Sequence, residues 1–334
     1  MSGDEQPRAV RVGVAGLGYW GPNIARNLAA IDGCELVWLC DASEQARERL
    51  ASAFPGARTT AALADVLADE TVDAVALATP VPTHAELASA VLAAGKHCFV
   101  EKPLATNVAD AQRALDAAAQ SGRVLMVGHL LEYHPAVQKL KELIDADELG
   151  ALYYIYGNRL NLGKLRADEN ALWSLGAHDV SVALHLIGEE PVECVAQGAA
   201  YVRRPVQDVV FCFLRFPSGV VAHLHLSWLD PHKERRITVV GAKRMATFDD
   251  MLIEGKLTIY DKGFDEDTSS WGEYIARSGD TFSPRIPNRE PLRLECEHFV
   301  ECVRTGAAPR SDGASGLRVV RVLEMLQRSL DASG

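Results

Sequence analysis

The chain has 334 residues, 48% of them hydrophobic, so it can bury a sizeable core and is expected to form two domains. Its formal net charge is -11 at pH 7 and it has no long basic run, which argues against nucleic acid and anionic membranes as partners. No stretch approaches the roughly 18 apolar residues of a membrane-spanning helix, and the polar first residues contain no secretion signal. A cytoplasmic globular protein is therefore predicted.

The sequence gives little sign of a metal site. Seven cysteines are scattered through apolar segments without a Cys-x-x-Cys pair, so we expect reduced core residues. His223 and His225 share one face of a predicted strand, and Cys296, His298 and Cys302 share a short helical segment. Neither set has the remaining ligands or the spacing of a zinc site, and no metal is predicted.

A glycine-rich turn follows the first predicted strand, residues 10–15. The turn is Gly16-Leu17-Gly18-Tyr19-Trp20-Gly21, and Pro22 and a helix over residues 23–30 come next. Gly16 permits a tight turn, Gly18 lets the backbone approach a pyrophosphate, and Gly21 lets helix and strand pack closely. Phosphates would bind the free N–H groups at the start of the helix. We therefore expect residues 16–21, including Tyr19 and Trp20, to bind a dinucleotide.

Asp41 follows the second predicted strand, residues 36–40, where an acidic side chain accepts hydrogen bonds from the adenosine ribose. A carboxylate there accepts from a 2'-hydroxyl but repels a 2'-phosphate, and no arginine follows it immediately. This favours NAD over NADP as the cofactor. A structural role for Asp41, as the N-terminal cap of a helix over residues 43–54, is compatible with that function.

Strands and helices continue to alternate through the first half of the chain. Helices are expected at residues 61–68, 84–94 and 108–119, and strands at 74–78, 98–100 and 124–127. This alternation predicts an α/β Rossmann domain over residues 1–128, with ligands above the carboxyl ends of its parallel strands. By itself the Glu101-Lys102 pair is typical of a solvated strand end, but this topology puts Lys102 on the cofactor rim.

The motifs of this half resemble those of one known family. Val14-Ala15-Gly16-Leu17-Gly18-Tyr19-Trp20-Gly21, then Ala78-Thr79-Pro80 followed by His84, and Glu101-Lys102-Pro103-Leu104 resemble the glucose-fructose oxidoreductase and inositol dehydrogenase family (Gfo/Idh/MocA). The resemblance extends from Val10 to the region of Leu330. It implies that Thr79, Pro80, His84, Glu101 and Lys102 contact the cofactor. It also implies that Lys102 lies between nicotinamide and substrate, and that the bond to Pro103 is cis.

Beyond Gly128 the pattern changes to a few helices followed by clustered strands. It predicts a second, α+β domain over residues 129–334, with a large, mostly antiparallel, open-faced sheet for substrate binding and oligomerisation. Helices are expected at 135–144, 178–187, 292–305 and 314–329, strands at 194–197, 209–216, 220–228, 235–240, 245–248 and 256–260, and a long loop, a candidate binding lid, at 261–289. Four apolar side chains are expected on the face that meets a second subunit of a homodimer or homotetramer: Phe213, Leu224, Leu226 and Trp228.

Several polar side chains of this domain are candidates for substrate binding. His129 and Tyr133 lie in the segment that leaves the predicted sheet at the rim of Lys102. The stretch of residues 153–166 reads as a strand that runs into a polar, basic loop, and it contains Arg159, Asn161, Lys164 and Arg166. A solvated loop is the simpler interpretation of these cations. In an acidic protein, their cluster also predicts an anionic ligand such as a diphosphate.

His178 begins a predicted helix and matches the Gly-x-His motif of the family, which implies that it acts on the substrate hydroxyl. Many family members carry aspartate four residues earlier, where this chain has Ser174. A serine hydroxyl can orient an imidazole but cannot balance its positive charge, and whether Asp179 compensates stays open. Ser174 and Asp179 are both included in the predicted substrate site.

The resemblance implies hydride transfer between nicotinamide and a sugar carbon. A lysine beside oxidised nicotinamide should have a lowered pKa, so Lys102 is a proton shuttle or a donor to the developing alkoxide. His178 is the expected general base in oxidation. The substrate predicted by resemblance is a nucleotide-linked hexose. The alternatives are a free polyol such as inositol, or binding of NAD and a sugar nucleotide without turnover.

Overall fold

The computed structural model describes residues 8–163, 165–166, 169–266 and 274–333, so the expectations for residues 1–7 and for Lys164 lie outside the described residues. The chain divides into two compact units, Met1–Leu130 with Glu290–Val320 and Leu131–Arg289 with Arg321–Gly334. Residues 290–320 thus join the first unit, whereas the sequence interpretation grouped them with the second domain. Within the described ranges, no helix is long and apolar enough to cross a membrane.

The return of the chain to the first unit depends on contacts between residues far apart in the sequence. Helix α8 (Pro291–Thr305) lies against the first helix, where Arg293 Nη1 donates to Asn27 O at 3.1 Å. Arg304 Nη2 donates to Asp32 O at 2.9 Å, just beyond that helix. The periodicity of α8 shows that it is a helix but does not show which surface it covers.

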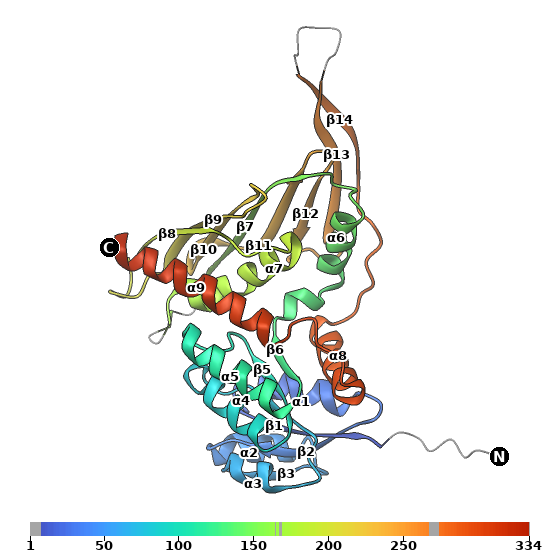
Figure 1. Cartoon of the computed structure of the whole chain (residues 1–334), viewed down its shortest axis with the longest axis vertical. Helices are drawn as coiled ribbons and strands as arrows, with labels where there is room; N and C mark the ends of the chain where they lie inside the picture. The colour runs from blue at the N-terminus through green and yellow to red at the C-terminus, as the bar shows by residue number, and fades with distance from the viewer. Residues whose placement is uncertain (1–7, 164, 167–168, 267–273, 334) are drawn as a thin grey trace, which may run out of the picture. The chain divides into compact units, whose positions relative to one another are not determined.

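The first unit contains a six-stranded parallel sheet in the order β3-β2-β1-β4-β5-β6. Its strands are β1 (Val10–Ala15), β2 (Cys34–Cys40), β3 (Arg58–Thr60), β4 (Ala74–Leu77), β5 (His97–Glu101) and β6 (Leu125–Gly128). Its helices are α1 (Gly21–Ala29), α2 (Glu44–Ala51), α3 (Leu63–Ala68), α4 (His84–Ala93), α5 (Val108–Ser121), α8 and the start of α9 (Gly313–Ser333), with a short 3-10 turn η1 (Val81–Thr83). This order confirms the predicted doubly wound Rossmann fold (Figure 1).

Burial explains the composition of these strands. All four residues of β4 are buried, as are Val12, Val14 and Leu39 in β1 and β2, because helices cover both faces of a parallel sheet. The short strand β3 was not predicted, since its residues Arg58, Thr59 and Thr60 are polar and lie at the sheet edge. The core therefore leaves only the ends of the strands available for ligands.

The second unit contains an eight-stranded sheet in the order β14-β13-β12-β11-β7-β10-β9-β8. The strands are β7 (Leu152–Leu162), β8 (Glu193–Ala199), β9 (Val209–Arg215), β10 (Val221–Ser227), β11 (Leu229–Gly241), β12 (Met245–Asp249), β13 (Leu257–Glu266) and β14 (Tyr274–Phe282). Neighbours are antiparallel except for the parallel pair of β7 and β10. This confirms the predicted mostly antiparallel sheet.

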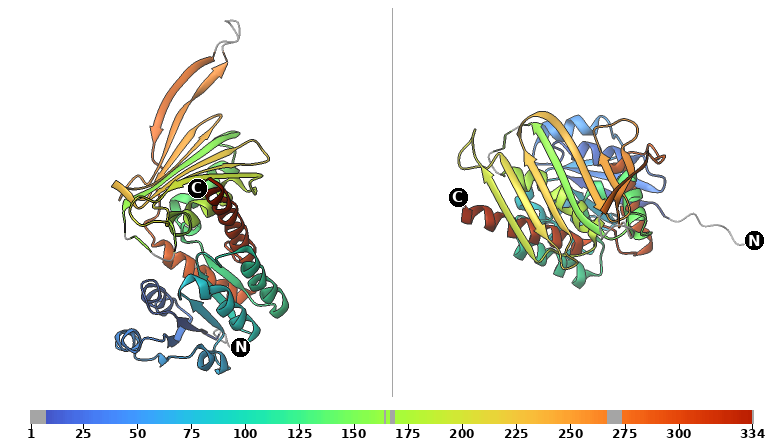
Figure 2. Two further views of the ribbon diagram at one scale, coloured as in Figure 1. Left: turned by 90° about the vertical axis from the view of Figure 1, so that its left-hand side faces the viewer. Right: turned by 90° about the horizontal axis from the view of Figure 1, so that it is seen from above.

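In the part of the chain that the structure describes, helices cover one face of this sheet and leave the other open (Figure 1, Figure 2). They are α6 (Pro135–Asp145), η3 (Leu172–Gly176), α7 (Ala177–Ile187) and the C-terminal part of α9, preceded by the short turn η2 (Leu130–Tyr133). The end of α9 is held by Ser329, whose Oγ accepts from Ala196 N of β8 at 2.9 Å.

The prediction of which apolar residues occupy the open face was wrong for three of four. Leu224, Leu226 and Trp228 are only 1%, 0% and 3% exposed, on the face that the helices cover. Side chains alternate along a strand, and Phe213 pairs with His223 rather than with Leu224, so Phe213 lies on the opposite face. Aromatic side chains on that open face include Phe211, which stacks on His225 at 4.4 Å, and Tyr154, which stacks on Tyr156 at 6.3 Å.

The predicted loop at residues 261–289 was also wrong, because most of it extends the sheet. β13 and β14 form a long hairpin that projects from the rest of the sheet (Figure 1), and residues 267–273, which connect the two strands in the sequence, lie outside the described part. At its base, Arg277 Nε pairs with Asp261 at 3.2 Å. Most side chains of this segment are exposed, and most of its residues are therefore polar or charged. Because such a segment lacks the apolar pattern of a strand, the sequence predicted a loop.

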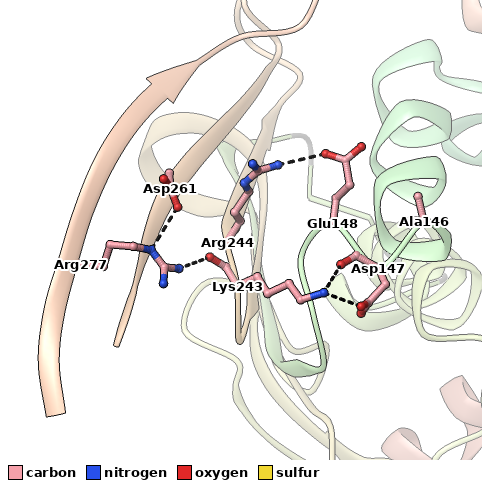
Figure 3. A pocket seen from close by; sticks show the side chains of 7 residues that line it. All are labelled: Ala146, Asp147, Glu148, Lys243, Arg244, Asp261 and Arg277. Carbon is pink, nitrogen blue, oxygen red and sulfur yellow. Dashed lines mark hydrogen bonds and ion pairs between the residues drawn. The ribbon is translucent and has the colours of Figure 1, made fainter. Parts of the chain in front are cut away.

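A pocket near the base of this hairpin is lined by charged side chains of the segment that follows α6, of the turn between β11 and β12, and of the hairpin (Figure 3). Lys243 Nζ pairs with Asp147 at 2.5 Å and Arg244 Nη1 with Glu148 at 3.0 Å, beside the Arg277–Asp261 pair. The three cations that line this pocket each already have a carboxylate partner. Two of these pairs join the turn between β11 and β12 to the segment after α6, and the third lies within the hairpin.

Candidate active site

The glycine turn after β1 is closed on its inner side and open on its outer side. Gly16 has φ +88°, and a Cβ built there would lie 2.5 Å from the carbonyl of Ala78 in the loop after β4. A Cβ at Gly21 would collide with Gly16 O. At Gly18, in contrast, no atom of the described residues other than its immediate chain neighbours lies within 4 Å of the position that a Cβ would take. The turn therefore has the space that a pyrophosphate needs at Gly18.

The two aromatic residues of the turn lie at its surface. Tyr19 is 83% exposed and its ring meets the ring of Trp20 edge-to-face at 5.7 Å. Tyr19 O accepts a hydrogen bond from Asn23 Nδ2 at 3.0 Å, so α1 holds the turn in place. The exposure of Tyr19 leaves its ring available to a bound cofactor.

Asp41 joins the glycine turn to the start of α2. Its Oδ2 accepts from Leu17 N at 2.6 Å, and its Oδ1 accepts from Ser43 N at 2.8 Å. The cap of α2 is Ser43, whose Oγ accepts from Ala46 N at 3.3 Å. The Asp41 carboxylate is thereby fixed at the carboxyl end of β2, where an adenosine ribose is expected.

His84 ties together the loops that follow β4 and β5. Its Nδ1 lies 2.8 Å from Pro103 O and its Nε2 lies 2.8 Å from Thr79 O, and Thr79 Oγ1 accepts from Thr83 Oγ1 at 2.9 Å. The ring is 1% exposed, and burial lowers the pKa of His84. A neutral ring can donate to only one of the two carbonyls. His84 thus positions the exposed Pro80 and the cis Lys102–Pro103 bond beside it.

Glu101, Lys102 and His129 lie at the carboxyl ends of β5 and β6. Glu101 pairs with Gly128 across the two strands, and its Oε2 accepts from Lys102 N at 3.3 Å. Burial raises the pKa of Glu101 to about 7, an effect that the neighbouring Lys102 partly offsets. Burial also lowers the pKa of His129 to about 3, and the positive charge of Lys102 adds to that effect.

The imidazole of His129 is buried but forms no hydrogen bond to a described residue. It is 1% exposed, and neither ring nitrogen has a hydrogen-bond partner among the described residues. Buried polar atoms normally have partners, so such a ring is a candidate for binding a ligand or water. His129 thus brings a neutral donor and acceptor close to the charge of Lys102.

In the second unit, the predicted residues Arg159 and Asp179 form a buried ion pair. Arg159 Nε lies 2.5 Å from Asp179 Oδ2 and Nη2 lies 3.2 Å from Oδ1, and the two side chains are 10% and 1% exposed. The pair joins β7 to the first turn of α7. Arg159 is therefore not an unpaired cation for a diphosphate, and Asp179 is committed to Arg159.

His178 follows a segment of unusual helical geometry. Residues Leu172–Gly176 form the π-helix η3, which runs into α7 at Ala177, so the helical segment begins before the predicted start. π-helical turns occur frequently at functional sites. Ser174 lies in η3, and half-buried His178 lies in the first turn of α7, where its carbonyl accepts from Ser181 Oγ at 2.9 Å.

An amide network holds η3 in place. Asn170 Nδ2 donates to Gln207 at 3.1 Å and to Gln327 of α9 at 2.9 Å, and Trp173 Nε1 donates to the same Gln327 oxygen at 3.1 Å. The sequence interpretation missed this network. An amide residue before a helix start was its only local signal, because Gln207 and Gln327 come from distant segments.

The remaining predicted substrate residues have different surroundings. Arg166 is exposed and pairs with Glu169 at 2.7 Å. The Oδ1 atom of Asn161 is buried and has no hydrogen-bond partner within the described ranges. Tyr133 is 2% exposed. Arg159 and Arg166, two of the cations expected to bind a diphosphate, are thus paired with carboxylates. Asn161 keeps an acceptor oxygen that no described residue uses.

An open glycine turn, a fixed Asp41 and Lys102 at the carboxyl ends of one parallel sheet are the features of a dinucleotide-dependent oxidoreductase. Comparison with known families agrees with that class. The oxidoreductase family with an NAD-binding Rossmann fold matches residues 10–129, and the GFO/IDH/MocA C-terminal domain matches residues 137–247. The chain belongs to the Gfo/Idh/MocA oxidoreductase family, as the sequence motifs predicted.

Relatives in this family act on several substrates. UDP-N-acetylglucosamine 3-dehydrogenase of Acidithiobacillus ferrooxidans is 30% identical over 97% of this chain and 98% of its own. Its solved structure has a TM-score of 0.82 and also covers 97% and 98% of the two chains. The scyllo-inositol 2-dehydrogenase (NAD(+)) of Bacillus subtilis is 27% identical, over 90% of this chain and 88% of its own. GenD2 from gentamicin A biosynthesis, solved with NAD, is 26% identical with a TM-score of 0.82, over 98% and 95%.

Proposed function

We propose that this protein transfers hydride between NAD and a secondary hydroxyl or keto carbon of a sugar, with a nucleotide-linked hexose as the preferred substrate class. The observation that carries the proposal is the arrangement of the open turn at Gly18, the fixed Asp41 carboxylate and Lys102 on one edge of the first unit. When bound there, NAD supplies the hydride acceptor.

The residues of the first unit would hold the cofactor as follows. The turn at residues 16–21, with Tyr19 and Trp20, receives the pyrophosphate, and Asp41 accepts from the ribose hydroxyls. Thr79, Pro80 and Glu101 line the edge toward the nicotinamide, while His84 positions their loops. We favour NAD because a carboxylate at Asp41 accepts from a 2'-hydroxyl.

Proton transfer at the substrate hydroxyl is assigned to Lys102 and His178. Because Asp179 is paired with Arg159 and Ser174 carries no charge, neither residue supplies the balancing charge of the family aspartate to His178. We therefore assign Lys102 Nζ a larger share of the proton movement. A neutral His129, close enough for Lys102 to influence its pKa, would help to orient the substrate hydroxyl.

The preference for a nucleotide-linked hexose rests on the similarity to UDP-N-acetylglucosamine 3-dehydrogenase. Asn161, Tyr133 and His129 are the proposed substrate contacts. Arg159 and Arg166 support this preference less than expected, because both are paired with carboxylates. A free polyol is the second candidate, since scyllo-inositol 2-dehydrogenase is also a relative.

The function is tested with a panel of UDP-, dTDP- and GDP-hexoses and free inositol, with NAD supplied and reduced nicotinamide followed by absorbance. We expect turnover of a nucleotide-linked hexose. We also expect Lys102→Ala to lower kcat by about 100-fold or more while the Kd of NADH changes less than about threefold. Lys139→Ala, an exposed lysine on α6 that pairs with Glu142, is the control and should behave as wild type.

Two outcomes contradict the proposal. Turnover of inositol with no turnover of any nucleotide-linked hexose would assign the protein to the polyol dehydrogenases. Binding of NADH and of a sugar nucleotide without turnover in either direction would identify a binding protein.

A further inference from the structure

The loop between β8 and β9, residues 200–207, lies at the edge of the eight-stranded sheet where β7 ends. Trp228 N, just beyond β10, donates to Asp208 O at 2.9 Å, and Gly163 N, just beyond β7, donates to Trp228 O at 2.9 Å. These hydrogen bonds join the start of β9 to the ends of β10 and β7. The β8–β9 loop therefore begins and ends at the same sheet edge as Asn161, the proposed substrate contact whose Oδ1 is buried and unused by the described residues.

A buried carboxylate holds the backbone of the β8–β9 loop. Asp208 is 1% exposed, and its Oδ2 accepts from Tyr201 N at 3.0 Å and from Val202 N at 2.8 Å. The side chains that follow are exposed, namely those of Tyr201, Arg203 and Arg204. The loop thus presents one aromatic ring and two guanidinium groups from an anchored backbone.

The same loop is attached to the helical segment that leads to His178. Ala171 N donates to Gln207 O at 3.0 Å, and Asn170 Nδ2 donates to Gln207 Oε1 at 3.1 Å. From Ala171, η3 and α7 continue to His178 over a length of about 10 Å. An extended hexose with its diphosphate has a comparable length. A hexose at His178 could therefore reach the β8–β9 loop with its diphosphate.

The arginines of this loop differ from the predicted diphosphate ligands in their partners. Arg159 and Arg166 each pair with a carboxylate. Arg203 and Arg204 form no ion pair with any residue that the structure describes. Guanidinium groups match the geometry of phosphate oxygens and bind them through two parallel hydrogen bonds. The β8–β9 loop therefore offers two cations for a diphosphate where the first two are neutralised.

We propose that the β8–β9 loop is the subsite for the nucleoside diphosphate of the substrate. Arg203 and Arg204 bind the diphosphate, and the Tyr201 ring stacks on the base, as exposed aromatic rings do with bases in general. The inference rests on the proposed function and assigns the nucleotide half of its substrate to named residues. Asn161 and His178 are left for the hexose.

The test measures the binding of UDP, dTDP and GDP by isothermal titration calorimetry, without NAD. We expect wild-type protein to bind at least one of them, and Arg203→Ala/Arg204→Ala to weaken that binding by about 10- to 100-fold. Arg203→Lys/Arg204→Lys should recover part of the affinity, because lysine keeps the charge but not the two parallel hydrogen bonds. Tyr201→Ala should weaken the same diphosphate by about 5- to 100-fold.

Kinetics and NADH binding show where the arginines act. With the matching nucleotide-linked hexose, the double alanine variant should raise KM and change kcat by less than about threefold, because the diphosphate does not react. The Kd of NADH should be unchanged, which separates this subsite from the pyrophosphate of the cofactor. Arg215→Ala is the matched control and should behave as wild type. Arg215 pairs with Glu193 at the other end of β9, about 20 Å from the loop.

The outcomes separate this inference from the proposed function. Equal binding of the diphosphate by wild type and the double alanine variant would overturn the subsite and leave hydride transfer intact. Loss of NADH binding in that variant would also overturn it, because the arginines would then serve the cofactor. Failure of wild type to bind any of the three diphosphates, with turnover of inositol, would overturn the subsite and the nucleotide-linked substrate together. Arginine-dependent binding of a diphosphate without any turnover would support the subsite and refute hydride transfer.

Discussion

Glu101 is a single residue whose ionisation affects both the site and the stability of the first unit. It is buried at the end of β5, next to Lys102, and its pKa is raised to about 7 from an ordinary value of 4.5. A raised pKa means that the folded state favours the protonated carboxyl. The corresponding stability is fully present below pH 4.5 and is lost as the pH rises through about 7.

We therefore expect Glu101→Gln to stabilise the protein without ligand at alkaline pH. The amide keeps the shape of the protonated acid and has no charge to bury. At about pH 8 the free energy of unfolding should rise by about 1–3 kcal/mol, and the gain should shrink as the pH falls toward 5. Urea denaturation followed by circular dichroism across this pH range measures the difference.

Glu254→Gln is the control, because Glu254 lies in an exposed turn of the second unit. It should change the free energy of unfolding by less than about 0.5 kcal/mol at every pH. A Glu101→Gln protein that is less stable than wild type at alkaline pH would show that the charged carboxylate is the stabilising form.

At the scale of elements, the ion pair of Arg159 and Asp179 fixes α7 on β7. It thereby also fixes His178, the residue that precedes Asp179. His178 lies in the same helical turn, so its placement depends on this pair and on the amide network around η3. The chain has Ser174 where many family members have an aspartate. The first turn of α7 is instead anchored by Asp179, the residue next to His178. The pair positions His178 and does not supply charge to it.

Removal of one partner of this pair should be costly, because it leaves a buried charge alone. Asp179→Ala is expected to lower the free energy of unfolding by about 3–5 kcal/mol, whereas the double variant Arg159→Met/Asp179→Leu should lose less. Thermal and urea unfolding measure both.

The more exposed pair of Arg166 and Glu169 provides the comparison, and Arg166→Ala should cost no more than about 1 kcal/mol. Equal losses in Asp179→Ala and Arg166→Ala would mean that the Asp179 pair is not buried in solution.

At the scale of the whole molecule, the open face of the eight-stranded sheet requires an explanation. Phe211, Tyr154 and Val195 are 45%, 42% and 40% exposed there, in a mostly antiparallel sheet whose helices, among the described residues, lie on its other face. Exposed apolar area of this kind marks interaction sites. We propose that a second copy of the chain covers it, in a homodimer or homotetramer.

Phe211→Glu should therefore lower the assembly state, since it places a charge within the proposed contact. Multi-angle light scattering after gel filtration should show a shift toward the mass of one 36.2 kDa chain. Ile253→Glu, at a residue 95% exposed in the turn before β13, should leave the mass of the wild-type assembly unchanged. A wild-type protein that is already monomeric, or a Phe211→Glu protein of unchanged mass, would refute the proposal.

The sequence by itself determined the Rossmann fold, the glycine turn and the position of Asp41 and Lys102 at strand ends. Each is specified locally, by a run of apolar residues, a glycine that must adopt positive φ, or a charged residue directly after a strand. The family could also be identified from the sequence alone, because its motifs lie within short segments. The sequence predicted a strand at residues 256–260, where β13 begins, but missed the rest of the hairpin because its exposed residues have no apolar pattern.

Only the tertiary structure decided which charged residues meet. The sequence predicted Arg159 and Asp179 as two separate site residues and grouped α8 with the second domain. Folding pairs Arg159 with Asp179 and returns α8 to the first unit. Hydrogen bonds and ion pairs act over a few ångströms in space, and residues far apart in the chain come within that range only when the fold forms.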